Sequence, residues 1–414
     1  MSKTNSVENV SQKNIQIQVQ IQSQPQIKLS DLLDTADRVD AVISSVRETM
    51  LEPDSRKKAP SFTTNQVAQV CGLDRSQMQY RIRKGDLPNP TSESVRKKKT
   101  FSLKDTVVWS RSLRSKFMRP DGAEAIAIAV ANFKGGVTKT TTAVTLAQGL
   151  SLRGHKVLVI DMDPQASLTS LFGLLNEDID DEETLMPLCY GNEVSADYAI
   201  RKTYWDGIDI IPANLGLYAA EFALPARQKE NESFDFWNVV SNGIDSARVG
   251  YDAIIIDTSP SLSYLTINAL FAADAIIMPV PPNTLDFTSS GQFWNLFNDL
   301  ATNLIINRGK TKSYEFVDVL LAKVDSNDTS SVIVRKWIQS AYGDMVLPVE
   351  IPRTSVTAGA SAEFGTVYDA ALSSIDARTY RRAFEAYERV VELVEGQIIV
   401  AWARQMEALK SLTT

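Results

Sequence analysis

Downstream of residue 125 the chain alternates between continuous apolar runs and amphipathic segments. The apolar runs are rich in β-branched residues, as strands buried on both faces are, and they lie at Ala125–Ala131, Val157–Asp161, Ile208–Pro212, Ala253–Asp257, Ala275–Val280, Val317–Leu321 and Val346–Ile351. Segments with helical periodicity separate them. This alternation predicts an α/β fold with a doubly wound, mostly parallel sheet. Ligands of such a sheet bind at the carboxyl ends of its strands.

Other segments carry helical or polar patterns. Apolar residues recur at helical spacing over 29–52, and a helix there cannot bury that stripe alone. It either packs on the next domain or pairs with a second copy as a dimerisation helix. A second amphipathic helix is predicted from Asp376 to about Leu412. Residues 1–28 are rich in Ser, Asn and Gln and predict a disordered Gln-rich tail.

Residues 58–119 carry a helix-turn-helix pattern. Thr64 can cap a first helix, Cys71-Gly72-Leu73 supplies a tight turn, and Asp74 or Arg75 opens a second helix. An ordinary solvated helical hairpin would show the same pattern. The candidate DNA-binding donors of the second helix are Arg75, Gln77, Gln79, Arg81 and Arg83. The lysines Lys97, Lys98 and Lys99, together with Thr100 to Leu103, resemble a β-wing that would follow it.

Charge favours the DNA-binding interpretation. The formal net charge of the protein is -7, yet Arg56 to Arg119 contains sixteen Lys and Arg residues against four acidic residues, a net charge of +12. Such asymmetry is typical of a polyanion-binding module. We therefore expect a winged helix-turn-helix DNA-binding domain at 58–119.

Composition excludes several other classes of site. The two cysteines, Cys71 and Cys189, lie far apart, which argues against a disulfide framework or a zinc site. The single histidine, His155, cannot build a histidine metal site and is expected to be exposed in a helix-to-strand turn. No apolar run reaches transmembrane length, and the N-terminus lacks a signal-peptide core, so a cytoplasmic location is expected.

A phosphate-binding loop follows the first predicted strand. The run is Lys134-Gly135-Gly136-Val137-Thr138-Lys139-Thr140-Thr141, and a helix is predicted after it. Its glycines let backbone N–H groups turn inward, Lys139 would reach the terminal phosphates, and Thr140 would bind Mg²⁺. Phe133 and Thr138 stand where the usual pattern has glycine, so the run is the deviant K-G-G-x-x-K-[ST] with an extra lysine, Lys134.

Two further strand ends carry carboxylates. The strand at 157–160 ends in Asp161-Met162-Asp163, and the strand at 253–256 ends in Asp257. Carboxylates beside a phosphate loop can orient an attacking water and hold Mg²⁺. We expect Asp257 to be the Walker B carboxylate.

Taken together, these motifs resemble a known family. K-G-G-V-x-K-T-T, then D-x-D-P-Q, then Y-D-x-I-I-I-D-T-S-P-S-L closely resemble the ParA/MinD family of deviant Walker A ATPases, over roughly Ala125 to Asp369. The predicted ATPase domain with its C-terminal helices spans 123–414. The basic module before it is similar to that of the larger plasmid-partition ParA proteins.

The resemblance implies roles for individual residues. Lys139 would be the P-loop lysine, Asp163 the carboxylate that positions water, and Asp161 a neighbour that biases Mg²⁺. Lys134 would be the signature lysine that reaches the partner's phosphates across an ATP-sandwich dimer. The segments Lys323-Val324-Asp325 and Ile351-Pro352-Arg353 lie where the family holds adenine, so Asp325 and Pro352 join the predicted nucleotide site.

The resemblance also implies a function in plasmid or chromosome segregation. ATP and Mg²⁺ would be the cofactors, and an ATP-bound homodimer would bind DNA non-specifically on the nucleoid. A ParB-like centromere-binding partner would stimulate hydrolysis, and the helix-turn-helix would bind an operator as autorepressor. The alternative is a nucleotide-regulated transcriptional repressor without a segregation role. A MinD-like membrane attachment is disfavoured, because Gln405–Lys410 is only weakly basic.

Overall fold

The structure is a computed structural model that describes residues 27–50, 57–91, 99–325, 327–353, 365–369 and 377–413. The chain separates into two compact units, 1–56 and 57–414. Most of the predicted tail, and the wing residues Lys97 and Lys98, lie outside the described residues.

The first unit contains helix α2 (Leu29–Met50), at the position predicted from the apolar stripe. Its side chains from Leu29 to Ser45 are all exposed, including the large apolar residues Leu32, Leu33 and Val42. That α2 dimerises stays a prediction.

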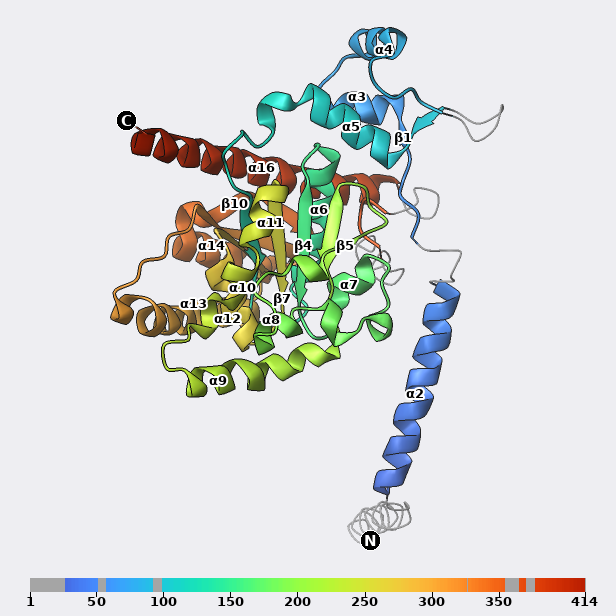
Figure 1. Cartoon of the computed structure of the whole chain (residues 1–414). Helices are drawn as coiled ribbons and strands as arrows, with labels where there is room; N and C mark the ends of the chain where they lie inside the picture. Colours follow the sequence, from blue (N-terminus) through green and yellow to red (C-terminus); the bar gives the residue numbers. More distant parts are fainter. Residues whose placement is uncertain are drawn as a thin grey trace, which may run out of the picture. The chain divides into compact units, whose positions relative to one another are not determined.

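An eight-stranded sheet forms the centre of the second unit, in the order β10-β9-β8-β3-β7-β4-β6-β5 (Figure 1). Its strands are β3 (Ile126–Val130), β4 (Val157–Met162), β5 (Arg201–Lys202), β6 (Ile208–Ile211), β7 (Ala253–Thr258), β8 (Ala275–Val280), β9 (Phe316–Val324) and β10 (Val346–Pro352). All neighbours pair in parallel except the edge strand β5, which is antiparallel to β6. The predicted doubly wound sheet and its strands are confirmed. The sequence missed β5, because two residues are too short to show a period.

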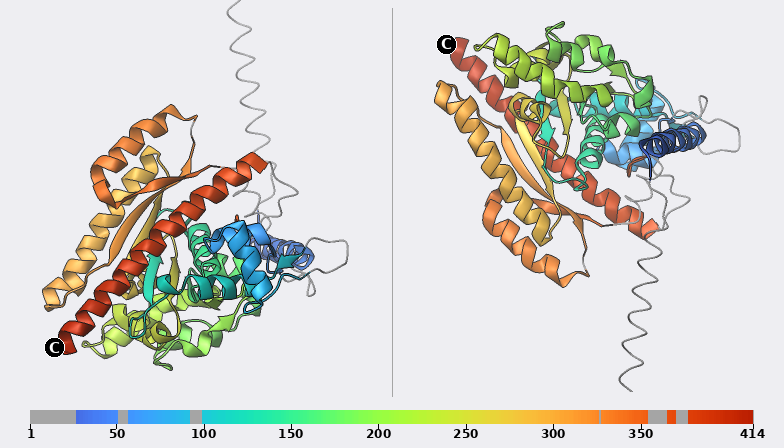
Figure 2. Two further views of the ribbon diagram at one scale, coloured as in Figure 1. Left: turned by 90° about the horizontal axis from the view of Figure 1, so that it is seen from above. Right: turned by 90° about the horizontal axis from the view of Figure 1, so that it is seen from below.

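Helices cover both faces of this sheet (Figures 1 and 2). They are α6 (Lys139–Leu152), α7 (Ser167–Leu171), α8 (Met186–Tyr190), α9 (Ala220–Glu230), α10 (Val239–Gly243), α11 (Asp245–Gly250), α12 (Tyr264–Ala272), α13 (Thr284–Leu304), α14 (Thr329–Tyr342) and α16 (Ala377–Thr413). Successive residues of a strand face opposite sides: Ile126 and Ile128 of β3 pack with α6 and α16, whereas Ala125 and Ala127 pack with α8 to α12. No helix of the described residues is long and apolar enough to cross a membrane.

A small basic module precedes the sheet. It consists of β1 (Phe62–Thr63), α3 (Thr64–Val70), α4 (Arg75–Lys84), β2 (Thr100–Phe101) and α5 (Leu103–Leu113). Its core contains Val67, Met78, Phe101 and Trp109. The two predicted helices and the turn between them are present, and Asp74 caps α4 as expected.

Two details of this module differ from the sequence prediction. The cap of α3 is Thr63, not Thr64, because Thr63 is extended and exchanges hydrogen bonds with Gln66. Thr100 and Phe101 do form a strand, but they pair with β1, and Leu103 begins α5 because the Ser102 hydroxyl caps that helix.

The C-terminal end of α6 is the place where the basic module joins the sheet domain. Arg111 Nη1 donates to the Gly154 carbonyl at 2.7 Å and to the buried carboxylate of Asp252 at 2.8 Å. Arg114 donates to Glu395 at 2.8 Å and to the Arg153 carbonyl at 2.7 Å.

The prediction that His155 is exposed is wrong. Its ring is 2 % exposed under α16, and Nε2 lies 2.7 Å from a carboxylate oxygen of Glu395. Burial alone would raise the pKa of Glu395, but the hydrogen bonds from His155 and Arg114 lower it to about 2. Glu395 therefore stabilises the fold above its usual pKa of 4.5, and that contribution is lost as the pH falls towards 2.

We expect Gly154→Ala to destabilise the protein more than Gly309→Ala. Both glycines have positive φ, +97° and +70°, so alanine is strained at either position by about 1 kcal/mol. A Cβ at Gly154 would also lie 2.6 Å from the Arg111 backbone nitrogen, whereas one at Gly309 would meet nothing within 4 Å. The extra clash should cost roughly 1–3 kcal/mol. Urea unfolding of both variants measures the difference, and equal losses would contradict the packing described.

Candidate functional site

Strand register gathers the predicted nucleotide residues at one edge of the sheet. β7 lies between β3 and β4, and Asp257 of β7 is paired with Val130 of β3 and with Asp161 of β4. Because these strands are parallel, the loop after β3 starts at the same edge at which both carboxylates end their strands.

The phosphate loop is held by its own backbone and by Asn132. The Asn132 side chain accepts the Lys134 N–H at 3.0 Å and donates to the Pro279 carbonyl at 2.8 Å. Gly135 and Gly136 are exposed, and Val137 is buried beneath them. Thr138 caps α6 with φ +77°, a conformation that a β-branched residue rarely adopts. Thr140 and Thr141 then form the first turn of α6.

Lys139 is nearly buried at this edge. Its side chain is part of a residue only 7 % exposed, and Nζ donates to the Lys134 carbonyl at 3.0 Å. Burial lowers the pKa of Lys139, while the negative charges of Asp257 and Asp163 act in the opposite direction. The ammonium is thus positioned inside the loop, next to two carboxylates.

Asp257 is a buried carboxylate that lacks protein donors. It is 0 % exposed, and neither carboxylate oxygen has a hydrogen-bond partner among the described residues. Burial, and then the charge of Asp161, raise the pKa of Asp257 well above its usual range, whereas Thr140 and Lys139 lower it. An orphaned carboxylate near a threonine hydroxyl fits a hard divalent cation.

The donor set is a poor match for a cation held by protein alone. The described ranges contain no group of three or more His, Cys, Asp or Glu side chains suited to a metal ion. Mg²⁺ is commonly bound by one or two carboxylates together with phosphates and waters. The site therefore fits Mg²⁺ that arrives with a nucleotide.

Asp161 is held by hydrogen bonds to neighbouring residues. One oxygen accepts from the backbone N–H and the hydroxyl of Thr169, at 2.9 and 2.8 Å, and the other accepts the Asp163 N–H at 3.1 Å. Burial raises the pKa of Asp161 to about 7. These bonds fix the turn that carries Asp163, which is 9 % exposed and accepts the Gln165 N–H. The predicted contact of Asp161 with Mg²⁺ stays a prediction.

The predicted adenine residues lie at the ends of two neighbouring strands. Pro352, the last residue of β10, pairs with Val324 of β9, and Asp325 follows directly after β9. A carboxylate oxygen of Asp325 accepts the Asn327 N–H at 2.9 Å.

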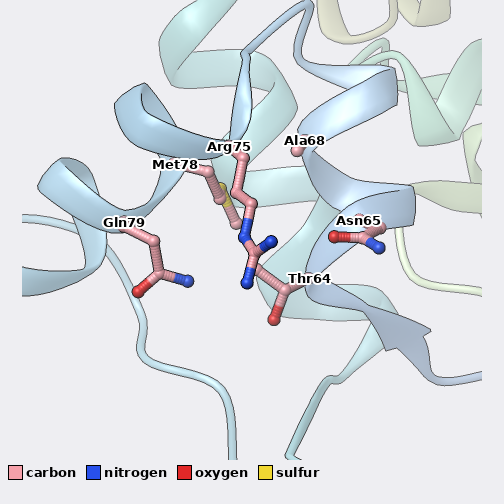
Figure 3. A pocket seen from close by; sticks show the side chains of 6 residues that line it. All are labelled: Thr64, Asn65, Ala68, Arg75, Met78 and Gln79. Carbon is pink, nitrogen blue, oxygen red and sulfur yellow. The ribbon is translucent and has the colours of Figure 1, made fainter.

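The helix-turn-helix surface carries most of the predicted DNA-binding donors. Arg75, Gln79 and Arg83 are exposed on α4, and Lys99 is exposed just before β2. Arg75 and Gln79 line a cavity of about 280 Å³ between the first turns of α3 and α4, with Thr64, Asn65, Ala68 and Met78 (Figure 3). Arg81 is half-buried, and its guanidinium pairs with Asp86 at 3.4 Å.

Comparison with known proteins identifies the family. Residues 125–308 match the AAA domain family model. The chain is 30% identical to Protein SopA of Escherichia coli (strain K12), over 84% of this chain and 90% of that protein. It is 31% identical to the chromosome partitioning protein ParA of Caulobacter vibrioides (strain NA1000 / CB15N), over 58% of this chain and 84% of that protein.

The chain belongs to the ParA/MinD family of deviant Walker A ATPases. It is a ParA-type partition ATPase. Among solved structures, cobyrinic acid a,c-diamide synthase from Mycobacterium smegmatis, with bound ATP analog and magnesium, superposes with a TM-score of 0.51. It shares 28% sequence identity and covers 65% of this chain and 93% of its own.

Several functional contacts of this ATPase escaped the sequence analysis. Thr169 orients Asp161, and Gln77, predicted to contact DNA, accepts the Asp74 N–H at 2.9 Å as part of a capping box. The D-x-x-Q spacing could have revealed that box. Tyr80, placed in the second helix for its apolar ring, is 61 % exposed on α4 instead.

We expect Asp257→Asn to stabilise the nucleotide-free protein and to abolish its response to Mg²⁺-nucleotide. The carboxylate is ionised without a donor at neutral pH, so its removal should raise the free energy of unfolding by about 2 kcal/mol. Because burial raises its pKa, the penalty grows as the pH rises from 3.8, and the gain should shrink towards pH 4. Urea unfolding with EDTA at pH 5 and 7 measures it. The exposed Asp299→Asn is the control, and a less stable Asp257→Asn protein at pH 7 would contradict the analysis.

Proposed function

We propose that this ParA-type partition ATPase hydrolyses ATP to ADP and phosphate in a Mg²⁺-dependent reaction. The observation that supports this most is the buried Lys139 ammonium beside Asp257 and Asp163. Inward N–H groups from Gly135 to Thr141 would bind the phosphates, since a loop at a helix N-terminus favours anions.

Other residues would divide the chemistry among them. Thr140 and Asp257 would hold Mg²⁺, with Asp161 behind them, and a bound Mg²⁺ would neutralise charge on the phosphates. Asp163 would orient the attacking water, because Asp161 and Gln165 fix its turn. Asp325 and Pro352 would face the base.

The active form is proposed to be a homodimer. The loop uses the Lys134 backbone, through its N–H and its carbonyl, so the side chain is available to reach a second subunit's phosphates. The exposed apolar stripe of α2 is a second candidate contact between copies, since burial of Leu32, Leu33 and Val42 would remove that apolar surface from water.

DNA is the proposed partner of two separate surfaces. The basic helix-turn-helix, with Arg75, Gln79, Arg83 and the lysines 97–99, would bind an operator and repress transcription. The ATP-bound dimer would bind DNA non-specifically, so that the protein associates with the nucleoid in the cytoplasm. A ParB-like centromere-binding protein would stimulate hydrolysis.

One observation favours the alternative, a nucleotide-regulated repressor without a segregation role. Arg111 and Arg114 of the basic module bond to Gly154 and Arg153, directly beyond the helix that begins at Lys139. A change in the phosphate loop could therefore reach the DNA-binding module through α6 alone.

We expect Lys139→Gln to weaken ATP binding roughly 100-fold, because a hydrogen bond to a charged group is worth up to about 3 kcal/mol. Asp163→Asn should bind ATP as the wild type does and hydrolyse it roughly 100-fold more slowly. Titration calorimetry and phosphate release with DNA present measure both steps. Lys156→Gln, at the opposite edge of the sheet, is the control. ATP binding by Lys139→Gln at wild-type affinity would refute the assignment.

We expect Arg75→Ala combined with Arg83→Ala to weaken binding to upstream DNA and to reduce its salt dependence by about one unit of slope per lost phosphate contact. The control is Arg389→Ala, an exposed arginine of α16 that pairs with Glu392. Footprinting with ATP and with ADP separates the two functions. A protein that protects one short site and never coats generic DNA with ATP is a repressor alone.

A further inference from the structure

Backbone strain is concentrated at the nucleotide edge of the sheet. Three residues other than glycine have positive φ in the described part of the chain: Thr138 at +77°, Ala166 at +54° and Lys323 at +53°. Thr138 belongs to the phosphate loop, and Ala166 follows Asp163 by three residues. Lys323 comes from the far end of β9, and no motif accounts for it. Strained residues persist only where the surrounding structure holds them.

A bulge in β9 produces the unusual conformation of Lys323. Leu321 pairs with Glu350 of β10, and Val324 pairs with Pro352, so β9 has one residue more than its partner between these pairs. A bulge re-aims a side chain that regular pleating would point elsewhere. Ala322 and Val324 stay buried, while Lys323 is exposed.

The re-aimed side chain contacts the phosphate loop. Lys323 Nζ donates to the Gly136 carbonyl at 2.6 Å, across 187 residues of sequence. Gly136 itself has φ +73°. In a loop whose N–H groups turn towards a phosphate, the carbonyls must turn away, and each then needs a donor. Lys323 supplies that donor to the peptide that joins Gly136 to Val137.

We propose that Lys323 is a positioning residue of the phosphate loop, which fixes the Gly136–Val137 peptide with its N–H towards the nucleotide. The inference rests on the proposed ATP site. An ammonium on the carbonyl forms a charge-assisted hydrogen bond and polarises the peptide, so the Val137 N–H becomes a stronger donor. The contact also ties the phosphate loop to Asp325, two residues further on, and thereby couples the phosphate side of the site to the base side.

This role differs from those of the other two lysines. Lys139 points to the terminal phosphates and Lys134 to a second subunit, so their loss should affect ATP most. Lys323 acts through the backbone of the loop, so its loss should weaken ATP and ADP by the same factor. It should raise KM for ATP and leave kcat within about twofold.

The test uses three substitutions in the full-length protein. Lys323→Met removes the ammonium and keeps the backbone strain, and Lys323→Gly removes the ammonium and relieves the strain at φ +53°. Lys323→Arg keeps the charge. The probes are ADP and ATPγS with Mg²⁺, in titration calorimetry, and Lys229→Met on the surface of α9 is the control.

We expect Lys323→Met and Lys323→Gly to bind both nucleotides about tenfold more weakly, whereas Lys323→Arg and the control bind within about threefold of the wild type. Because glycine suits this backbone conformation, weak binding by Lys323→Gly cannot be ascribed to strain or misfolding. Wild-type affinity in Lys323→Met or in Lys323→Gly would overturn the proposal, and so would a loss confined to ATPγS, which indicates direct contact with the terminal phosphate. Failure of the wild-type protein to bind either nucleotide would instead refute the proposed function.

Discussion

The buried Lys139 ammonium depends on carboxylates that other strands bring to it. An isolated ammonium would be costly to remove from water, by several kcal/mol even after relaxation. Asp257 at the end of β7 and Asp163 after β4 offset part of that cost. Their own burial is unfavourable in turn, which is why the pKa of Asp257 rises and its oxygens have no donors among the described residues. Such a charge set is best satisfied by a polyanion together with a divalent cation.

Helix α6 extends the influence of this site to the opposite edge of the sheet. Its fourteen residues span about 21 Å at 1.5 Å per residue. Lys139 begins it among the carboxylates, and Arg153, Gly154 and His155 follow its end among Arg111, Arg114 and Glu395. Glu395 is held ionised by these cations, so the basic module and α16 are fastened to the same turn. A rigid element with a ligand at one end and a second module at the other is a simple route for communication.

Strain gives a third view of the site. Thr138, Ala166 and Lys323 adopt backbone conformations in which glycine would be relaxed, and each lies after a strand that ends at the nucleotide edge. The surrounding sheet and loops hold them there. A family that uses an exposed loop to bind and release phosphates needs N–H groups aimed before the ligand arrives, and fixed backbone geometry provides that aim.

The sequence by itself determined the strands, the phosphate loop and the order of the site residues. Each of these depends on local pattern: β-branched runs make strands, and Gly135-Gly136 before Lys139 makes a loop that binds phosphate. Parallel pairing then brings the ends of those strands together, so Asp161 and Asp257 could be predicted as neighbours. The D-x-x-Q box at Asp74 was also a local signal, although it was read as a DNA contact.

Only the tertiary structure decided what long-range contacts do. His155 looked exposed in its turn, yet α16 covers it with Glu395, 240 residues away. Lys323 looked like an ordinary residue near the base, yet a bulge turns it onto Gly136. Two-residue β5 and the pairing of β2 with β1 depend likewise on partners distant in sequence. Hydrophobic period and motif spacing report the local chain, whereas a buried ion pair or a bulge exists only once distant segments have packed.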